Sequence, residues 1–432
     1  MMGQDQKPAI GRKFLVIGAG MAGLGAAQHL VQAGARVTVI EARNRIGGRT
    51  WTSHLWPDLP VDLGASWVHG VTGNPLTAIA NTIGAVRTPT RYSRSATYDE
   101  SGRRIEFLAE VKKAKALIRV ARRRANSLGH DISLQQAIET APEWSALAPQ
   151  DRRSIRLAIN TRIEHEYSGD WSCLSAWNFD DGTDFPGGDV VFNRGYGALV
   201  DQMAQGLDIR LGAVVRTIAP AGDGVVVTTE AGQHIADRVI VTLPLGVLKS
   251  GRVRFAKPLA KLRQQAIDGL EMGLLNKCWL RFDRVFWPAD VDWIDYLAPE
   301  QGLWGDWLNG LPSTGQPLLV GFNAAAMADR IETLDDRATT ASAMEALRRM
   351  FGTAIPDPLA SQITRWRQDP FALGSYSFNA VGTSAKSRRD LFGPDWAGRL
   401  HFAGEATSHD HPSTVHGALM TGRAAAATLL LT

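Results

Sequence analysis

The chain has 432 residues, of which 44% are hydrophobic and 21% charged, a composition that fits a folded globular protein with room for two domains. Its formal net charge of +4 is small for this length, so charge alone does not indicate a nucleic-acid partner. The two cysteines lie far apart and predict neither a metal centre nor a disulfide framework. Residues 1–13 are polar, and no apolar run approaches the roughly 20 residues of a membrane span, so we expect no signal peptide and no membrane partner. These features together predict a cytoplasmic protein.

The first predicted unit is a strand, a glycine-rich turn and a helix. Residues 14–17 are apolar, residues 24–31 carry apolar side chains at helical spacing, and a second strand is expected at 36–40. In a nucleotide-binding unit of this kind, the turn admits a diphosphate onto the helix N-terminus, and an acid after the second strand accepts hydrogen bonds from a ribose. The alternative is an ordinary unit that binds no nucleotide. The residues expected at the nucleotide are Gly18, Gly20, Met21, Ala22, Gly23 and Glu41.

A second glycine pair follows the acid at once. Ala42 and Arg43 lead into Gly48 and Arg49, which places an arginine within reach of the same phosphates. A Rossmann unit that binds NAD does not require this second loop.

Residues 61–73 combine small and aromatic side chains. Gly64, Ala65 and Ser66 suit a backbone that lies against a flat ligand. Trp67 and His69 alternate along an extended segment, so we expect both to point to the same side. A histidine that is only structurally satisfied or exposed to solvent is the alternative.

The middle of the chain contains a basic segment and then an acidic one. Residues 89–148 are predicted to be largely helical, and we interpret the basic run at 111–124 as the solvated face of an amphipathic helix rather than a nucleic-acid or membrane surface. Residues 152–189 offer carboxylates and tryptophans, which together suit a cationic amine. Exposed loop acids without a ligand are the alternative for any one of them.

Later segments supply strands and two further motifs. Short strands are predicted at 207–211, 214–218, 225–229, 239–243 and 273–282, and the last one contains Lys277. A lysine inside an apolar strand lies either on an exposed edge or in a buried place where its charge is satisfied or its pKa lowered. Residues 400–405 predict a strand that ends at Gly404 and Glu405, and a helix after residue 414 can direct backbone N–H groups to a diphosphate.

These motifs together resemble the flavin-containing amine oxidases, most closely the polyamine oxidases and the oxidase domain of lysine-specific histone demethylases. The resemblance rests on residues 41–49, 64–70, 277 with 286–288, 365–378, 404–408 and 413–419. It implies FAD rather than NAD, held noncovalently because no cysteine lies near Gly404 where monoamine oxidases attach the flavin. The fold it implies is α/β, with a discontinuous Rossmann-type FAD-binding domain (1–80, 190–255 and 375–432) and an inserted α+β substrate-binding domain (81–189 and 256–374).

The same resemblance implies roles for individual residues. Lys277 would hold a water near flavin N5, Trp366 would pack beside the isoalloxazine, and Tyr376 would form one wall of the amine site. Thr414 would lie beside the flavin, where monoamine oxidases carry a second tyrosine, and this departure argues against monoamine oxidation. The remaining implied contacts are Val215 at the adenine, Val415 and Ala418 at the flavin end, and His69, Glu164 and Asp181 at the substrate. His411 is a further departure to which we assign no role.

The expected activity is oxidation of an amine, by hydride transfer to flavin N5 and with O2 as acceptor, giving an aldehyde, an amine and hydrogen peroxide. We expect polyamines such as spermine, spermidine or their acetylated forms as substrates, and either a monomer or a homodimer. One alternative is an oxidase of another amine or of an L-amino acid, whose carboxylate needs an arginine in the pocket. An alternative of another class is a catalytically silent FAD-binding interaction protein.

Overall fold

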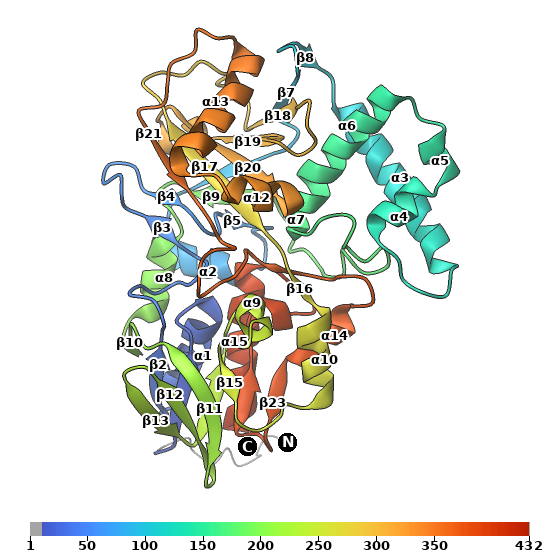
Figure 1. The fold of residues 1–432 in the computed structure, drawn as a ribbon. Coiled ribbons are helices and arrows are strands. Elements are labelled where there is room, and N and C mark those ends of the chain that lie inside the picture. The colour runs from blue at the N-terminus through green and yellow to red at the C-terminus, as the bar shows by residue number, and fades with distance from the viewer. Residues whose placement is uncertain (1–10, 432) are drawn as a thin grey trace.

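The computed structural model describes residues 11–431, so the expectations about residues 1–10 and Thr432 lie outside the described residues. Within that range the chain forms a lower part around a mostly parallel sheet, an upper part around a mostly antiparallel sheet, and a helical lobe at the side (Figure 1).

The lower sheet has six strands in the order β10 (Asp208–Arg210), β2 (Arg36–Ile40), β1 (Lys13–Ile17), β14 (Arg238–Val241), β24 (Leu400–Phe402) and β23 (Gly393–Asp395). The first five run parallel and β23 is antiparallel to β24. Strand β1 is buried on both faces, which explains its unbroken apolar sequence. Phe14 and Val16 belong to the core with the helices, while Leu15 and Ile17 pack toward a four-stranded sheet.

Two helices from opposite ends of the chain cover one face of this sheet. Helices α1 (Met21–Gln32) and α15 (Val415–Leu430) pack so closely that a Cβ on Gly422 would lie 1.9 Å from the carbonyl oxygen of Ala22. The other face is covered by the sheet β13 (Gly232–Ala236), β12 (Gly224–Thr229), β11 (Val215–Ala221) and β15 (Arg254–Phe255).

The upper sheet has seven strands in the order β21 (Ala360–Ile363), β17 (Leu275–Arg281), β20 (Leu318–Ala324), β19 (Asp306–Asn309), β18 (Trp293–Leu297), β7 (Ser95–Asp99) and β8 (Arg104–Ile105). Helices α12 (Ala325–Glu332) and α13 (Asp336–Phe351) cover its outer face (Figure 1). Its inner face looks toward the lower part and carries a cluster of tryptophans, leucines and Phe322.

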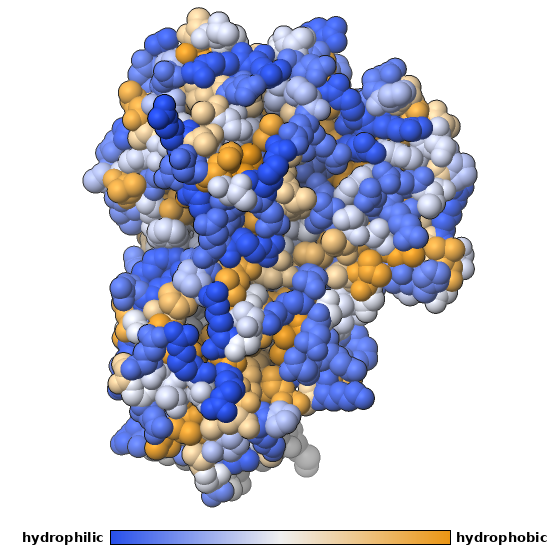
Figure 2. All heavy atoms as spheres, viewed as in Figure 1, coloured by the Kyte–Doolittle hydropathy of each residue, from blue (hydrophilic) through white to orange (hydrophobic). Residues whose placement is uncertain are grey.

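The helical lobe contains α3 (Leu108–Asn126), α4 (Leu134–Glu139), α5 (Pro142–Ser145) and α6 (Pro149–Ile159). Helix α3 buries an alanine- and leucine-rich stripe and turns its basic residues outward, where Arg122 and Arg124 pair with Asp180 and Glu143. Hydrophilic side chains dominate the visible side of this lobe, with apolar ones gathered at its lower edge (Figure 2). These pairings support the interpretation of the basic run as a solvated face.

The prediction that residues 89–148 are largely helical is wrong at its start. Residues up to 105 form β6 (Arg87–Thr90), β7 and β8, and β7 pairs in parallel with β18, nearly two hundred residues later. Pairing with a partner so far along the chain leaves no local pattern in the sequence.

Short elements connect these layers. A small sheet of β5 (Trp67–Val68), β9 (Asp189–Phe192) and β6 lies between the two parts. The other elements are β3 (Thr52–Ser53), β4 (Val61–Asp62), α2 (Pro75–Thr82), η1 (Asn160–Glu164), α7 (His165–Tyr167), α8 (Gly197–Ala204), α9 (Leu245–Lys249), α10 (Lys261–Gly269), β16 (Glu271–Met272), α11 (Leu311–Thr314), β22 (Ser377–Phe378), α14 (Ala385–Leu391) and η2 (Glu405–Thr407). Across residues 11–431, no helix is both long and apolar enough to cross a bilayer.

The position of helix α10 changes the domain boundary that was expected at residue 256. It packs against α14, and Arg263 on it pairs with Asp395 at 2.5 Å in the lower part. We therefore propose that the substrate-binding part resumes near β16 rather than at residue 256.

Candidate functional site

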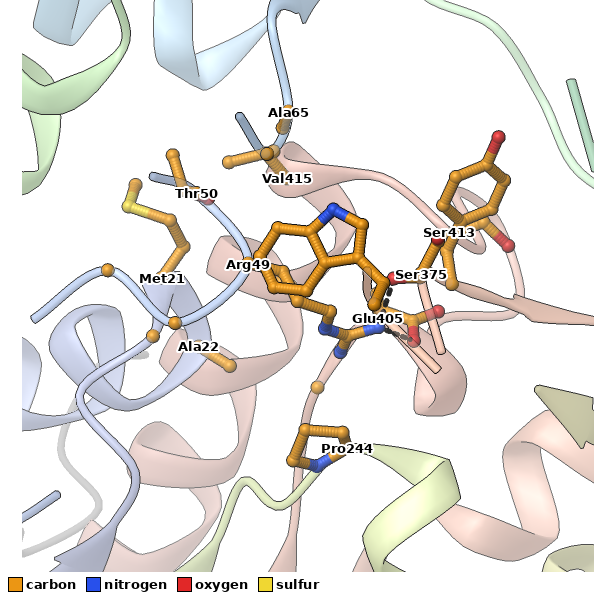
Figure 3. Close-up of a pocket in the computed structure, with 18 of the residues that line it drawn as sticks. Met21, Ala22, Arg49, Thr50, Ala65, Pro244, Ser375, Glu405, Ser413 and Val415 are labelled. Atoms are coloured by element: carbon orange, nitrogen blue, oxygen red, sulfur yellow. Dashed lines mark hydrogen bonds and ion pairs between the residues drawn. The ribbon is translucent and has the colours of Figure 1, made fainter. Parts of the chain in front are cut away.

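A single cavity of about 690 Å³ runs from the N-terminus of α1 to the inner face of the upper sheet. Its walls come from both ends of the chain, because Met21 and Ala22 on α1 face the same space as Glu405 and Val415 (Figure 3). The cavity therefore has a lower end beside the N-terminus of α1 and an upper chamber against the inner face of the upper sheet.

The glycine-rich turn after β1 forms the floor of the lower end. Gly18 has φ +105°, and a Cβ on Gly23 would lie 1.8 Å from the Gly18 carbonyl oxygen, so both positions require glycine. A Cβ on Gly20 would meet no protein atom closer than 3.9 Å, which leaves the backbone open to the cavity. Gly20 caps α1 without a side-chain hydrogen bond, and no acid lies in the first turn, so that end can receive an anion.

Glu41 holds the two glycine loops together. Its carboxylate accepts hydrogen bonds from the backbone N–H of Ala19 at 2.8 Å and of Arg43 at 2.9 Å, one on each oxygen. Each oxygen keeps a second lone pair that can accept a ribose hydroxyl. Arg43 lines the cavity, but its guanidinium is bound to Asp369 at 2.6 Å.

A second helix N-terminus meets the same cavity from the other end of the chain. Thr414 caps α15 by accepting a hydrogen bond from the Gly417 N–H, and Val415 and Ala418 line the cavity beside it. Gly404 has φ +138° with open space where a Cβ would lie. The first turn of α15 also lacks an acid, so a second positive helix end is directed at this space.

Buried Glu405 and partly buried Arg49 form an ion pair in the wall between these helix ends (Figure 3). Arg49 donates to Glu405 at 2.8 Å and to the carbonyl of Ser375 at 2.9 Å. Burial would raise the pKa of Glu405, but Arg49, the Ser377 hydroxyl and Arg388 outweigh burial and hold the pKa below its ordinary value.

This lower end fits FAD. It combines two helix N-termini free of acids, a glycine cradle without Cβ atoms and a carboxylate placed for a ribose. Among the predicted cofactor contacts, Gly23 alone does not line the cavity, because it packs α1 against the end of β1. The others that line it are Gly18, Gly20, Met21, Ala22, Glu41, Ala42, Arg43, Gly48, Arg49, Gly64, Ala65, Ser66, Trp67, Val215, Trp366, Gly404, Glu405, Thr414, Val415 and Ala418.

Lys277 lies at the junction between the dinucleotide end and the upper chamber. It is only 4% exposed, which excludes the exposed-edge alternative. Its Nζ donates to the carbonyl of Asp62 at 3.1 Å, to the Ser66 hydroxyl at 2.6 Å and to the carbonyl of Gly64. Burial lowers the pKa of Lys277 to about 8, although Asp62 acts in the opposite direction.

Trp366 and Tyr376 line the same cavity as this lysine. The Trp366 indole is buried and donates to the carbonyl of Leu63 at 3.2 Å, on the same segment that Lys277 contacts. The Tyr376 hydroxyl donates to the carbonyl of His165, which fixes the ring in the wall. Burial, with a smaller contribution from Glu166, raises the pKa of Tyr376 well above its ordinary value, so this hydroxyl stays neutral.

Trp67 and His69 point to the same side of their segment, as predicted, and continue a column of stacked rings. Trp67 stacks on His69 at 6.4 Å and on Trp293 at 5.7 Å, and Trp293 stacks on Tyr92 at 4.6 Å between ring centroids. The pairing of β5 with β9 brings His69 Nδ1 within 3.2 Å of Asp189. Burial would lower the pKa of His69, but Asp189 and the charges of Glu166 and Asp184 raise it above its ordinary value.

The structure does not place the two predicted acidic substrate contacts in the chamber. Glu164 is buried and binds the side-chain amide of Asn160 and the N–H of Trp171, whereas Asp181 accepts from the Ala385 N–H. Neither lines the cavity. Instead Glu166 faces the chamber, because the π-helical turn η1 shifts the side chains after it.

Several chamber residues were not singled out from the sequence. Asp189 and Glu166 belonged to a recognised acidic segment, but nothing local distinguished them from their neighbours. The additional residues are Tyr92, His165, Glu166, Tyr167, Phe179, Asp189, Trp293, Asp306 and Phe322. His411, left without a role, stacks on Phe185 and its Nδ1 lies 2.6 Å from the carbonyl of Thr183, so it fixes a neighbouring loop.

Comparison with known proteins agrees with this geometry. The sequence model of the flavin containing amine oxidoreductases matches residues 21–430. The chain is 35% identical over 433 residues to polyamine oxidase 2 of Arabidopsis thaliana, covering 95% of this chain and 86% of that protein. It is 34% identical to lysine-specific histone demethylase 1 homolog 3 of Oryza sativa subsp. indica, covering 99% of this chain but 55% of that protein. The solved structure of wild-type putrescine oxidase with bound putrescine has a TM-score of 0.80 at 22% identity, covering 98% of this chain and 99% of that one, which shows a shared fold.

Proposed function

The chain belongs to the flavin-containing amine oxidoreductases, a family of FAD-dependent enzymes, and we propose that it oxidises polyamines. The observation that carries the proposal is the continuity of one cavity from the dinucleotide cradle to an aromatic, acidic chamber, with Lys277 at the junction. The relatives named polyamine oxidase, at about one-third identity over most of the chain, support the same substrate class.

We propose that FAD is held noncovalently. The N-termini of α1 and α15 would neutralise the diphosphate, Glu41 would accept from the ribose, and Val215 would lie at the adenine. Within residues 11–431 neither cysteine lines the cavity, since Cys173 is exposed elsewhere and Cys278 is buried. When bound, FAD would supply the redox chemistry as acceptor of a hydride from the carbon beside the amine nitrogen, with O2 as the final acceptor and hydrogen peroxide as the product.

The charge of the chamber favours a cationic substrate. Glu166 is exposed and lines the chamber, and its charge contributes, after burial, to the raised pKa values of Tyr92, Tyr167 and Tyr376. Asp189 adds a second carboxylate at its rim, and aromatic rings can stabilise an alkylammonium through cation–π contact. These local acids attract a polycation although the whole chain is slightly basic.

The hydrogen bonds of Lys277 and His69 support the roles that we propose for them. The amine must be neutral to release a hydride from the adjacent carbon, and His69, with Nδ1 donating to Asp189, can orient it through Nε2. All three Nζ hydrogens of Lys277 have protein acceptors, so holding a water requires it to exchange one of them. The Ser66 hydroxyl is the acceptor best able to rotate away.

An L-amino acid is a poorer substrate for this chamber, because its carboxylate needs a free cation. The arginines that line the cavity are already bound: Arg43 by Asp369, Arg49 by Glu405, Arg216 by Glu230, Arg252 by the carbonyl of Pro370, and Arg388 by Ser377 and Asn379.

A peroxide assay of the purified, FAD-loaded protein tests the proposal. Spermine, spermidine, their N-acetylated forms and putrescine are compared with L-amino acids, in buffer that reproduces a cytoplasmic pH. Peroxide released from a polyamine and not from amino acids is the expected result. A flavin that no amine bleaches without oxygen would instead support the silent binding protein, with the face of α3 as its docking surface.

A further inference from the structure

Four residues form one row across the inner face of the upper sheet. Lys277 on β17 pairs with Phe322 on β20, Phe322 with Asp306 on β19, and Asp306 with Asp295 on β18. Residues paired in this way point to the same face of a sheet. Neighbouring strands are about 4.8 Å apart, so Asp306 lies about 10 Å along the sheet from Lys277.

Asp306 carries a hydrogen-bonding oxygen that has no partner. The residue is 1% exposed and lines the cavity, and its Oδ2 lies 3.4 Å from Arg162 and 3.8 Å from His165 Nδ1. Among the described residues nothing bonds its Oδ1, and His165 Nε2, also buried and on the cavity wall, is likewise unpartnered. An unpaired buried polar atom costs about 1–3 kcal/mol, so this site is completed by a group that enters from the cavity.

Asp306 shares its cationic partner with a second aspartate. Arg162 is shared between two carboxylates, with Asp295 the closer at 2.9 Å. Burial lowers the pKa of His165 to about 3, so its ring is neutral and adds no charge. One guanidinium therefore faces two aspartates. Burial and the charge of Asp295 raise the pKa of Asp306 well above its ordinary value although Arg162 opposes them, so a further cation beside Asp306 would favour its ionised form.

We infer that Asp306 accepts a hydrogen bond from the distal ammonium group of a diamine or polyamine whose reacting C–N bond lies beside Lys277. This inference rests on the proposed function and specifies how far from the reacting carbon the second charge is held. Phe322 lies between the two residues in the row, and Trp293 and Tyr92 also line the cavity, so aromatic surface is present for the methylene chain. A bound water alone is the competing occupant.

The test compares Asp306→Asn with the wild-type holoenzyme in the anaerobic reduction of the flavin by spermine and by butylamine. Butylamine has one amine and therefore no distal charge. If butylamine reduces the flavin too slowly, its dissociation constant is measured instead by its competition with spermine. We expect the dissociation constant for spermine to rise about tenfold to hundredfold, the range of a lost charged hydrogen bond, with the limiting rate of reduction and the butylamine constant unchanged.

The matched control is Asp292→Asn, a buried aspartate just before β18. It accepts from the Arg91 N–H at 2.9 Å and does not line the cavity, so both amines should bind this variant as they bind the wild type. An equal effect of Asp306→Asn on the two amines would overturn the inference, assign the site to water and leave the proposed function standing.

A measurement on the wild type remains decisive where Asp306→Asn does not fold. A series of diamines of increasing length is compared with monoamines of equal length. The diamine should bind more tightly, with the largest advantage at one intermediate length, and an absent advantage at every length would overturn the inference. A wild-type flavin reduced by no amine would overturn the proposed function and the inference together.

Discussion

Replacing Lys277 by methionine should change how the stability of the protein depends on pH. The side chain is buried and its pKa is lowered from 10.5 to about 8, chiefly by burial. A difference of this size corresponds to about 3 kcal/mol of free energy that opposes folding while the lysine is charged. Methionine has a similar length and no charge, so it removes the group that titrates.

The direction in which stability changes with pH follows from the number of protons bound by the folded and the unfolded protein. Between about pH 8 and pH 10.5 the unfolded chain keeps a proton on this lysine that the folded protein has released. The free energy of unfolding of the wild type therefore rises with pH in this window. Below pH 8 the charged, buried lysine destabilises the folded protein by the full amount. Relative to Lys277→Met, the wild type should gain about 2 kcal/mol between pH 7.5 and pH 9.5.

Urea unfolding of both proteins at one saturating FAD concentration measures this difference. Lys115→Met, on the exposed side of α3, is the control for loss of a lysine, and it should give a curve parallel to the wild type. The Lys277 variant should also keep its flavin absorbance and lose about a hundredfold or more in oxidation rate. Parallel stability curves for Lys277→Met and the wild type would refute the reasoning.

Three further outcomes are expected. Glu166→Gln should raise the KM for spermine about tenfold through loss of one charged contact, and an unchanged KM would remove Glu166 from the amine site. Gly23→Ala places a Cβ 1.8 Å from a backbone carbonyl and should yield protein without flavin absorbance, whereas Gly188→Ala, with open space around its Cβ, should remain yellow. Asp189→Asn should lower the pKa of His69 and shift the acidic limb of kcat/KM to lower pH, so a limb that stays in place would show that His69 is not the titrating group.

The sequence predicted the parts of this site that are built from consecutive residues. The strand, turn, helix and acid from β1 to Glu41 lie within one short segment, and each residue type has a stereochemical reason to be there. Lys277 was predicted through resemblance, and its burial is consistent with the pattern of its strand.

Parts that depend on long-range pairing or on a local irregularity could not be predicted. Glu164 was predicted to lie at the chamber, but Glu166 lines it instead, because the π-helical turn η1 shifts the side chains that follow it. Such a turn has no clear sequence signal. Asp306 gains its position only from the register of β19 against β20, and no local pattern links it to Lys277. For the same reason β7 was taken for helix.

The contact between α1 and α15 constrains when the enzyme can acquire its cofactor. The two helix ends that would neutralise the diphosphate are separated by about 390 residues, from Met21 to Val415. At a synthesis rate of about 5–20 residues per second, the first half of the cradle is made roughly 20–80 seconds before the second. A nascent chain therefore offers only one helix end to the diphosphate, and flavin loading follows translation of α15 rather than accompanying it.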